Sequence, residues 1–73
     1  MPLKPLLYRE VCRRLQAAGF VEVSQKGSHV KFVKTTAEQT RMVSVPKHRE
    51  VKVGTLRGIL RVAGITPEEW DTL

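Results

Sequence analysis

The sequence contains few of the features that cross-link a small protein by disulfides or anchor it in a membrane. Only one of its 73 residues is cysteine, so no intramolecular disulfide can form, and we expect a fold that is stable in a reducing compartment. That residue, Cys12, falls among helical apolar positions, which favours a small core residue. No apolar run approaches the ~18 residues that span a membrane, and the start lacks the apolar segment of a signal peptide. We therefore expect a cytoplasmic protein with no membrane partner.

The sequence also lacks residues arranged to bind a metal. No carboxylate pair and no Cys/His cluster has the spacing of metal ligands, so we expect neither a metal site nor another cofactor. Internal repeats and low-complexity tracts are absent as well. Because a chain this short buries only ~60% of its unfolded surface, the sequence predicts a single domain over residues 1–73 with one thin core.

Acidic residues are scarce over most of the chain. All 13 Lys and Arg residues lie within residues 1–63 beside only four acids, so this stretch carries a charge of +9, while the other three acids fall in the last ten residues. A basic body of this kind indicates a polyanion or an acidic protein surface as the partner.

The spacing of apolar residues predicts the order α-β-β-β-α. Residues 5–18 and 53–63 have a helical period, and residues 20–25, 29–34 and 41–45 resemble short strands. Short links favour an antiparallel sheet, and both helices must bury their apolar sides against one of its faces. The predicted fold class is therefore α+β, a two-layer sandwich like a double-stranded-RNA-binding domain, with a short C-terminal helical turn.

Glycines predict where these elements end. Gly19 and Gly64 follow the two helices, where each is expected to adopt the left-handed conformation. Gly27 supplies the positive φ of a short hairpin turn. Gly58, by contrast, lies inside the second helix and costs ~1 kcal/mol relative to alanine. Residues 35–40 are expected to form a polar loop.

Two local patterns predict which side chains reach the core. Alternation along the second strand directs Val30 and Phe32 to one face and His29 to the other. Residues 66–69 have the pattern of a capping box with proline at the first helical position. Trp70 is then expected to pin the final turn to the core.

The turn formed by Gly27, Ser28 and His29 is the best candidate for chemistry. RNA can be cut without a metal because its own 2′-hydroxyl attacks the adjacent phosphorus, and an imidazole can accept or donate the proton. Ser28 and the amide of Gly27 can hold a phosphate oxygen, and Lys26 and Lys31 can supply positive charge. The same residues can also form an ordinary hairpin with a surface histidine.

A second basic segment precedes the second helix. Lys47, Arg49 and Lys52 lie before a helix N-terminus, which attracts anions, so we expect them to bind the RNA backbone. His48 also lies in this segment, where the loop can hold it for packing.

Taken together, these motifs resemble the HicA family of toxin endoribonucleases. The resemblance rests on five short segments: Ala18-Gly19-Phe20, Gln25-Lys26-Gly27-Ser28-His29, Val45-Pro46-Lys47-His48, Gly54-Thr55-Leu56-Arg57 with Ile59-Leu60, and Ala63-Gly64-Ile65. It implies a double-stranded-RNA-binding-like fold, cleavage of messenger RNA and a HicB-like antitoxin as partner. It also implies that His29, in the Gly-Ser-His motif, is the catalytic histidine. Because similar proteins often carry a histidine after the proline of the third segment, the resemblance makes His48, which follows Pro46 by two residues, a candidate helper in catalysis.

Two other functions are compatible with the same residues. One is a non-catalytic RNA-binding module that uses the same basic surface, and the other is an interaction protein whose basic face docks an acidic partner. The Gly-Ser-His turn favours the ribonuclease, because a protein that only binds RNA has no need of an imidazole.

Overall fold

A computed structural model of the protein describes residues 3–73, so Met1 and Pro2 of the predicted domain lie outside the described residues. The elements follow the order β1 (Leu6–Leu7), α1 (Tyr8–Ala17), β2 (Val21–Lys26), β3 (His29–Thr35), β4 (Thr40–Pro46), β5 (Glu50–Val51), α2 (Val53–Ala63) and α3 (Pro67–Asp71). None of the helices within residues 3–73 has the length and hydrophobicity that a membrane crossing requires.

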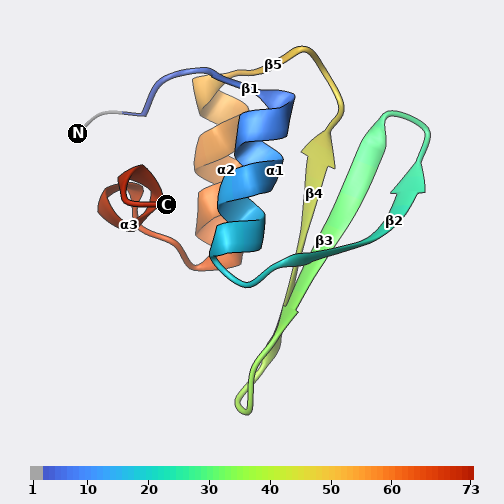
Figure 1. The fold of residues 1–73 in the computed structure, drawn as a ribbon, viewed down its shortest axis with the longest axis vertical. Helices are drawn as coiled ribbons and strands as arrows, with labels where there is room; N and C mark the ends of the chain where they lie inside the picture. The colour runs from blue at the N-terminus through green and yellow to red at the C-terminus, as the bar shows by residue number, and fades with distance from the viewer. Residues whose placement is uncertain (1–2) are drawn as a thin grey trace.

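The main sheet has the predicted antiparallel arrangement, with strand order β2-β3-β4. Figure 1 shows α1 and α2 side by side against it, with the tip of the β3–β4 hairpin extending beyond both helices. The β2–β3 turn lies at the opposite end of β3. The α+β fold predicted from the sequence, a two-layer sandwich like a double-stranded-RNA-binding domain, is therefore confirmed.

The core lies between the helices and one face of this sheet. Val30 and Phe32 of β3 are buried as predicted, and Trp70 of α3 is buried as well. The remaining buried residues are Val11, Leu15, Phe20, Val43, Val45, Val51, Leu56, Ile59, Leu60 and Ala63. Cys12 is partly buried and packs against this cluster, in agreement with its predicted role.

Both long helices end in the same backbone motif. Gly19 and Gly64 have φ values of 101° and 74°. The N–H of the residue after each glycine donates to a carbonyl in the last helical turn, from Phe20 to Leu15 and from Ile65 to Leu60. This is the Schellman arrangement, in which glycine provides the left-handed conformation without a steric penalty.

The first helix begins later than predicted. Residues 5–18 were expected to be helical, but Leu6 and Leu7 form β1, which pairs with Val51 and Glu50 of β5. Pairing in this second small sheet provides hydrogen-bond partners for backbone groups of residues that would otherwise begin the helix. Leu7 is consequently 44% exposed and does not join the buried side of α1.

The polar loop is shorter than predicted. Thr35 pairs with Thr40, and the Thr36 N–H donates to the Gln39 carbonyl at 2.8 Å, so residues 36–39 form the connection. The expected loop over residues 35–40 is therefore shortened to the four residues 36–39.

The final helix is held to α1 by a polar network. Arg14 donates to Glu10 at 2.8 Å and to the Trp70 carbonyl at 3.1 Å, and its guanidinium carbon lies 5.5 Å from the centre of the indole ring. The predicted capping box is present, because Thr66 accepts from the Glu69 amide and Glu69 accepts from the Thr66 amide. The short α3 is therefore fixed at both of its ends.

Candidate functional site

The Gly27–Ser28 turn joins β2 to β3 with two residues. Lys26 pairs with His29 across it, and Gly27 has a φ of 61° while no other residue type in the described chain has a positive φ. A glycine with positive φ at the first central position is typical of a type II′ turn, which matches the twist of a hairpin. The sequence therefore predicted the turn and the role of its glycine correctly.

His29 lies on the sheet face opposite the helices. Its neighbour Val30 is 1% exposed, and adjacent strand residues point to opposite faces, so the His29 imidazole is directed to solvent. Lys26 lies directly across from His29 on β2, and Lys31 lies two residues along β3 on the same face. Directly opposed side chains have Cβ atoms ~5 Å apart, so the turn gathers one imidazole and two cations.

The Lys47 backbone connects the second basic segment to this turn. Its N–H donates to the Ser28 carbonyl, and Pro46 pairs with His29. Lys47 and His48 therefore follow directly from the strand beside the candidate histidine, and both are exposed. Among residues 3–73, no hydrogen bond joins His48 to His29.

Arg49 and Lys52 flank β5, which belongs to the other sheet. The Arg49 carbonyl accepts the Tyr8 N–H at 3.2 Å, which ties this segment to the start of α1. Lys52 is the N-cap residue of α2, and no side chain caps that helix end. The first amides of α2 are consequently free to bind an anion beside Lys52.

The single cysteine lies near this region but is unsuited to act as a nucleophile. Burial raises the pKa of the Cys12 thiol above its ordinary value, while a hydrogen bond with Tyr8 lowers it. Burial also raises the pKa of the Tyr8 hydroxyl, and Cys12 adds to that effect. Both groups therefore keep their protons at neutral pH.

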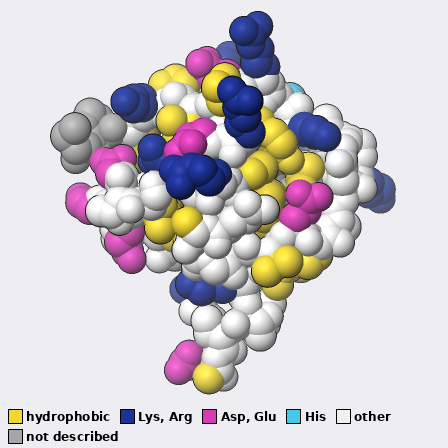
Figure 2. Space-filling view, in the orientation of Figure 1, with side chains coloured by type: hydrophobic (Ala, Val, Ile, Leu, Met, Phe, Trp, Pro, Cys, Tyr) yellow, Lys and Arg dark blue, Asp and Glu magenta, His cyan; other side chains and the backbone are white. Residues whose placement is uncertain are grey.

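Acidic side chains gather away from the turn. Figure 2 shows a group of Asp and Glu side chains over α3, with others at separate points of this face among the Lys and Arg side chains. Within residues 3–73, no group of three or more His, Cys, Asp or Glu side chains is arranged to hold a metal ion. The groups beside His29 are cationic, so they suit a phosphate rather than a metal.

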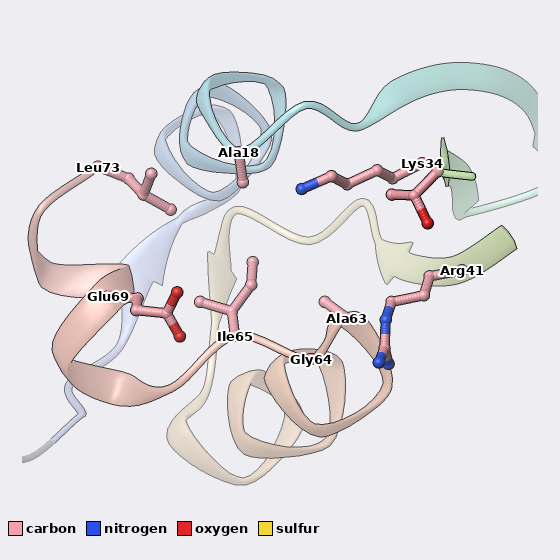
Figure 3. A pocket seen from close by; sticks show the side chains of 9 residues that line it. Ala18, Lys34, Arg41, Ala63, Gly64, Ile65, Glu69 and Leu73 are labelled. Atoms are coloured by element: carbon pink, nitrogen blue, oxygen red, sulfur yellow. The ribbon is translucent and has the colours of Figure 1, made fainter. Parts of the chain in front are cut away.

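A hollow of about 260 Å³ that the sequence analysis did not predict lies at the other end of the helices. Lys34 crosses it toward Ala18, and Glu69 points into it from α3 (Figure 3). Arg41, which pairs with Lys34, donates to the Val62 carbonyl at 3.0 Å. These cations lie at the C-terminal ends of α1 and α2, where positive charge stabilises a helix.

The signal for this hollow was present in the alternation of β3. Lys34 has the same parity as the buried Val30 and Phe32, which places it on the helix face. The glycines at the helix ends leave room for the two cations, since a Cβ at residue 64 would lie 2.7 Å from the guanidinium carbon of Arg41.

Comparison with known protein families matches most of the chain to a toxin family. A family model described as the HicA toxin of bacterial toxin–antitoxin systems matches residues 8–65, which is most of the chain and includes the Gly27–Ser28 turn, the basic segment and α2. No curated protein matches the chain.

Proposed function

The chain belongs to the HicA family of toxins from bacterial toxin–antitoxin systems, and from this premise we propose that it is a metal-independent endoribonuclease that cleaves messenger RNA with His29 as its catalytic residue. The observation that carries the proposal is the exposed His29 imidazole on the same sheet face as Lys26 and Lys31. An RNA phosphate at this face meets a proton-transfer group and two positive charges together.

The proposed reaction uses the RNA's own nucleophile. The 2′-oxygen loses its proton and bonds to phosphorus as the bond from phosphorus to the 5′-oxygen breaks, and the 5′-oxygen then takes up a proton. The products are a 2′,3′-cyclic phosphate and a 5′-hydroxyl. His29 serves in proton transfer, and the charges of Lys26 and Lys31 stabilise the developing negative charge on the phosphate oxygens.

The substrate is held by groups on both sides of His29. The Gly27 amide and the Ser28 hydroxyl lie in the turn itself, and Lys47 follows the strand that pairs with His29. The other proposed contacts to the RNA backbone continue from Lys47 to the free N-terminus of α2: His48, Arg49 and Lys52.

As the family implies, a toxin of this kind has an antitoxin partner. We propose an acidic HicB-like protein that covers His29 and the basic surface around it. Residues 1–63 carry a charge of +9, so an acidic partner is steered toward this surface, and covering the exposed imidazole excludes RNA.

The test is cleavage of RNA by the purified protein in excess EDTA, followed by analysis of the new ends. We expect cleavage to continue and to leave a 2′,3′-cyclic phosphate or its hydrolysis product. A 5′-phosphate product, or complete inhibition by the chelator, would contradict the mechanism. RNA binding without any cleavage would favour the alternative, a non-catalytic RNA-binding module.

A further inference from the structure

The outer edge of β4 has no partner strand within residues 3–73, because β4 is at the end of the order β2-β3-β4. Two backbone hydrogen bonds mark the ends of its ladder with β3. The Lys47 N–H donates to the Ser28 carbonyl at one end, and the Thr36 N–H donates to the Gln39 carbonyl at the other. These bonds fix which β4 residues pair with β3 and which point outward.

Met42 and Ser44 direct their backbone polar groups away from β3. Hydrogen-bonded and non-hydrogen-bonded pairs alternate in an antiparallel ladder. Met42 opposite Val33 and Ser44 opposite Lys31 have the parity of the non-hydrogen-bonded pairs. Their N–H and C=O groups therefore face outward from the sheet edge, where they can pair with an added strand.

An apolar groove of about 320 Å³ runs between this edge and α2. Met42 and Ser44 line it from β4, and Gly54, Gly58 and Val62 are among the α2 residues that line it. Met42 and Val62 are 51% and 52% exposed, which is high for large apolar side chains. The groove thus offers apolar surface directly beside unpaired backbone.

The packing of the described chain does not require glycine at the two glycine positions of the groove. A Cβ at Gly54 or Gly58 would meet nothing within 4 Å, and neither residue has a positive φ. Glycine inside a helix costs ~1 kcal/mol relative to alanine, so Gly58 carries a cost that the fold does not require. The absence of side chains leaves room for another backbone to approach.

We propose that an extended apolar segment of an acidic protein pairs with β4 as a fourth strand and fills the groove against Gly54 and Gly58. Arg57 and Arg61 are exposed on α2 and follow these glycines by three residues each, so they are neighbours of the glycines on the helix surface and add positive charge near the groove. A second copy of this chain would bring a charge of +6 against +6, which favours an acidic partner instead. The inference rests on the proposed function, in which that partner is the HicB-like antitoxin.

A strand at this edge would anchor its protein near His29. Pro46, which pairs with His29, is two residues from Ser44 along β4. Neighbouring strands lie ~4.8 Å apart, so the added strand is ~10 Å from β3. An antitoxin held here is close enough to cover the imidazole from the side of Pro46.

The experiment measures binding of the proposed HicB-like antitoxin to this chain, by calorimetry and by hydrogen exchange of the amides. We expect the amides of Met42 and Ser44 to exchange rapidly in the free protein and to be protected in the complex. Gly58→Leu fits the open space of the free protein but occupies the groove, so affinity should fall by about tenfold or more, the scale of losing an interface anchor. Gln16→Leu, which adds the same side chain to the exposed face of α1, should bind like the wild type.

Thermal melting establishes that both variants are folded. A complex in which Gly58→Leu binds normally and the amides of Met42 and Ser44 stay unprotected overturns the edge-pairing inference but leaves the antitoxin partnership intact. If the wild-type protein does not bind the HicB-like protein, the proposed partnership itself fails. Concentration-dependent dimers of this chain alone that Gly58→Leu abolishes would identify a second copy as the occupant and overturn the acidic partner.

Discussion

The cations at the α1–α3 contact and those around His29 differ in their bonding. Arg13 and Arg14 share the Glu10 carboxylate, and they also donate to the carbonyls of Leu73 and Trp70. Around the turn, by contrast, the cations Lys26, Lys31 and Lys47 take part in no ion pair within residues 3–73.

This contrast separates structural charge from charge that is available to a ligand. The α1–α3 cations have carboxylate and carbonyl partners that hold a short helix in place. Lys26 and Lys31 are exposed on the sheet face that no helix of residues 3–73 covers, and Lys47 is exposed beside the turn. Phosphate groups can therefore reach these cations without breaking an internal ion pair. Changes at the two regions should therefore affect different measurements.

The largest effect is expected from His29→Ala. Loss of proton transfer should slow RNA cleavage by roughly 10²–10⁴-fold. The exposed side chain contributes little to packing, so the free energy of unfolding should change by less than ~1 kcal/mol. Cleavage of a defined RNA and urea denaturation measure the two quantities.

His48→Ala is the matched control for this prediction, because His48 is also exposed and lies near the same turn. A smaller loss of activity than in His29→Ala is expected, since only His29 lies between two lysines on one sheet face. Wild-type cleavage by His29→Ala would remove the catalytic assignment.

Trp70→Ala should instead lower the stability of the fold. The indole is 1% exposed and lies beneath Arg14, so its truncation leaves a cavity and should cost ~3–5 kcal/mol of unfolding free energy. Glu68→Ala, on an exposed position of the same helix, should change stability by less than ~0.5 kcal/mol. If Trp70→Ala is as stable as the wild type, the packing of α3 against α1 does not contribute measurably to stability.

Local signals explain why most of the fold was predictable. The glycines at residues 19 and 64, the alternation of Val30 and Phe32, and the capping box each depend on a few neighbouring residues, and each is present in the structure. The β1–β5 pair was missed because Leu6 and Val51 are distant in sequence. Two-residue strands carry no periodic pattern of their own.

The candidate site was predictable in its turn but not in its surroundings. The two-residue turn fixes Lys26 opposite His29, so that neighbour followed from the sequence. The contact of Lys47 with Ser28 depends on the β3–β4 register, and the groove beside the β4 edge depends on the position of α2. Both are properties of the assembled fold, which local spacing does not specify.

A smaller effect is expected from removing two unpaired cations together, Lys47→Ala with Arg49→Ala. RNA affinity falls with salt because bound cations release counterions from the phosphates, and each contact contributes about 0.7 to the log–log slope on single strands. The double variant should therefore reduce the slope by about 1.4. Arg13→Ala removes a cation that is already paired with Glu10, so its slope should match the wild type, and an unchanged slope in the double variant would place the RNA anchor elsewhere.

The smallest effect concerns the pH dependence of the α1–α3 contact. Hydrogen bonds from Arg13 and then Arg14 lower the pKa of Glu10 from 4.5 to about 2. A carboxylate with a lowered pKa in the folded state contributes stability above its unfolded pKa, and this contribution is lost as the pH falls from about 4.5 to about 2. Glu10→Gln should flatten the decline of melting temperature over this range, whereas Glu38→Gln in the exposed β3–β4 connection should leave it unchanged. Because Glu10 is solvent-accessible, the effect should also shrink in high salt. Equal pH profiles for the wild type and Glu10→Gln would show that the ion pairs of Glu10 make no measurable contribution to stability.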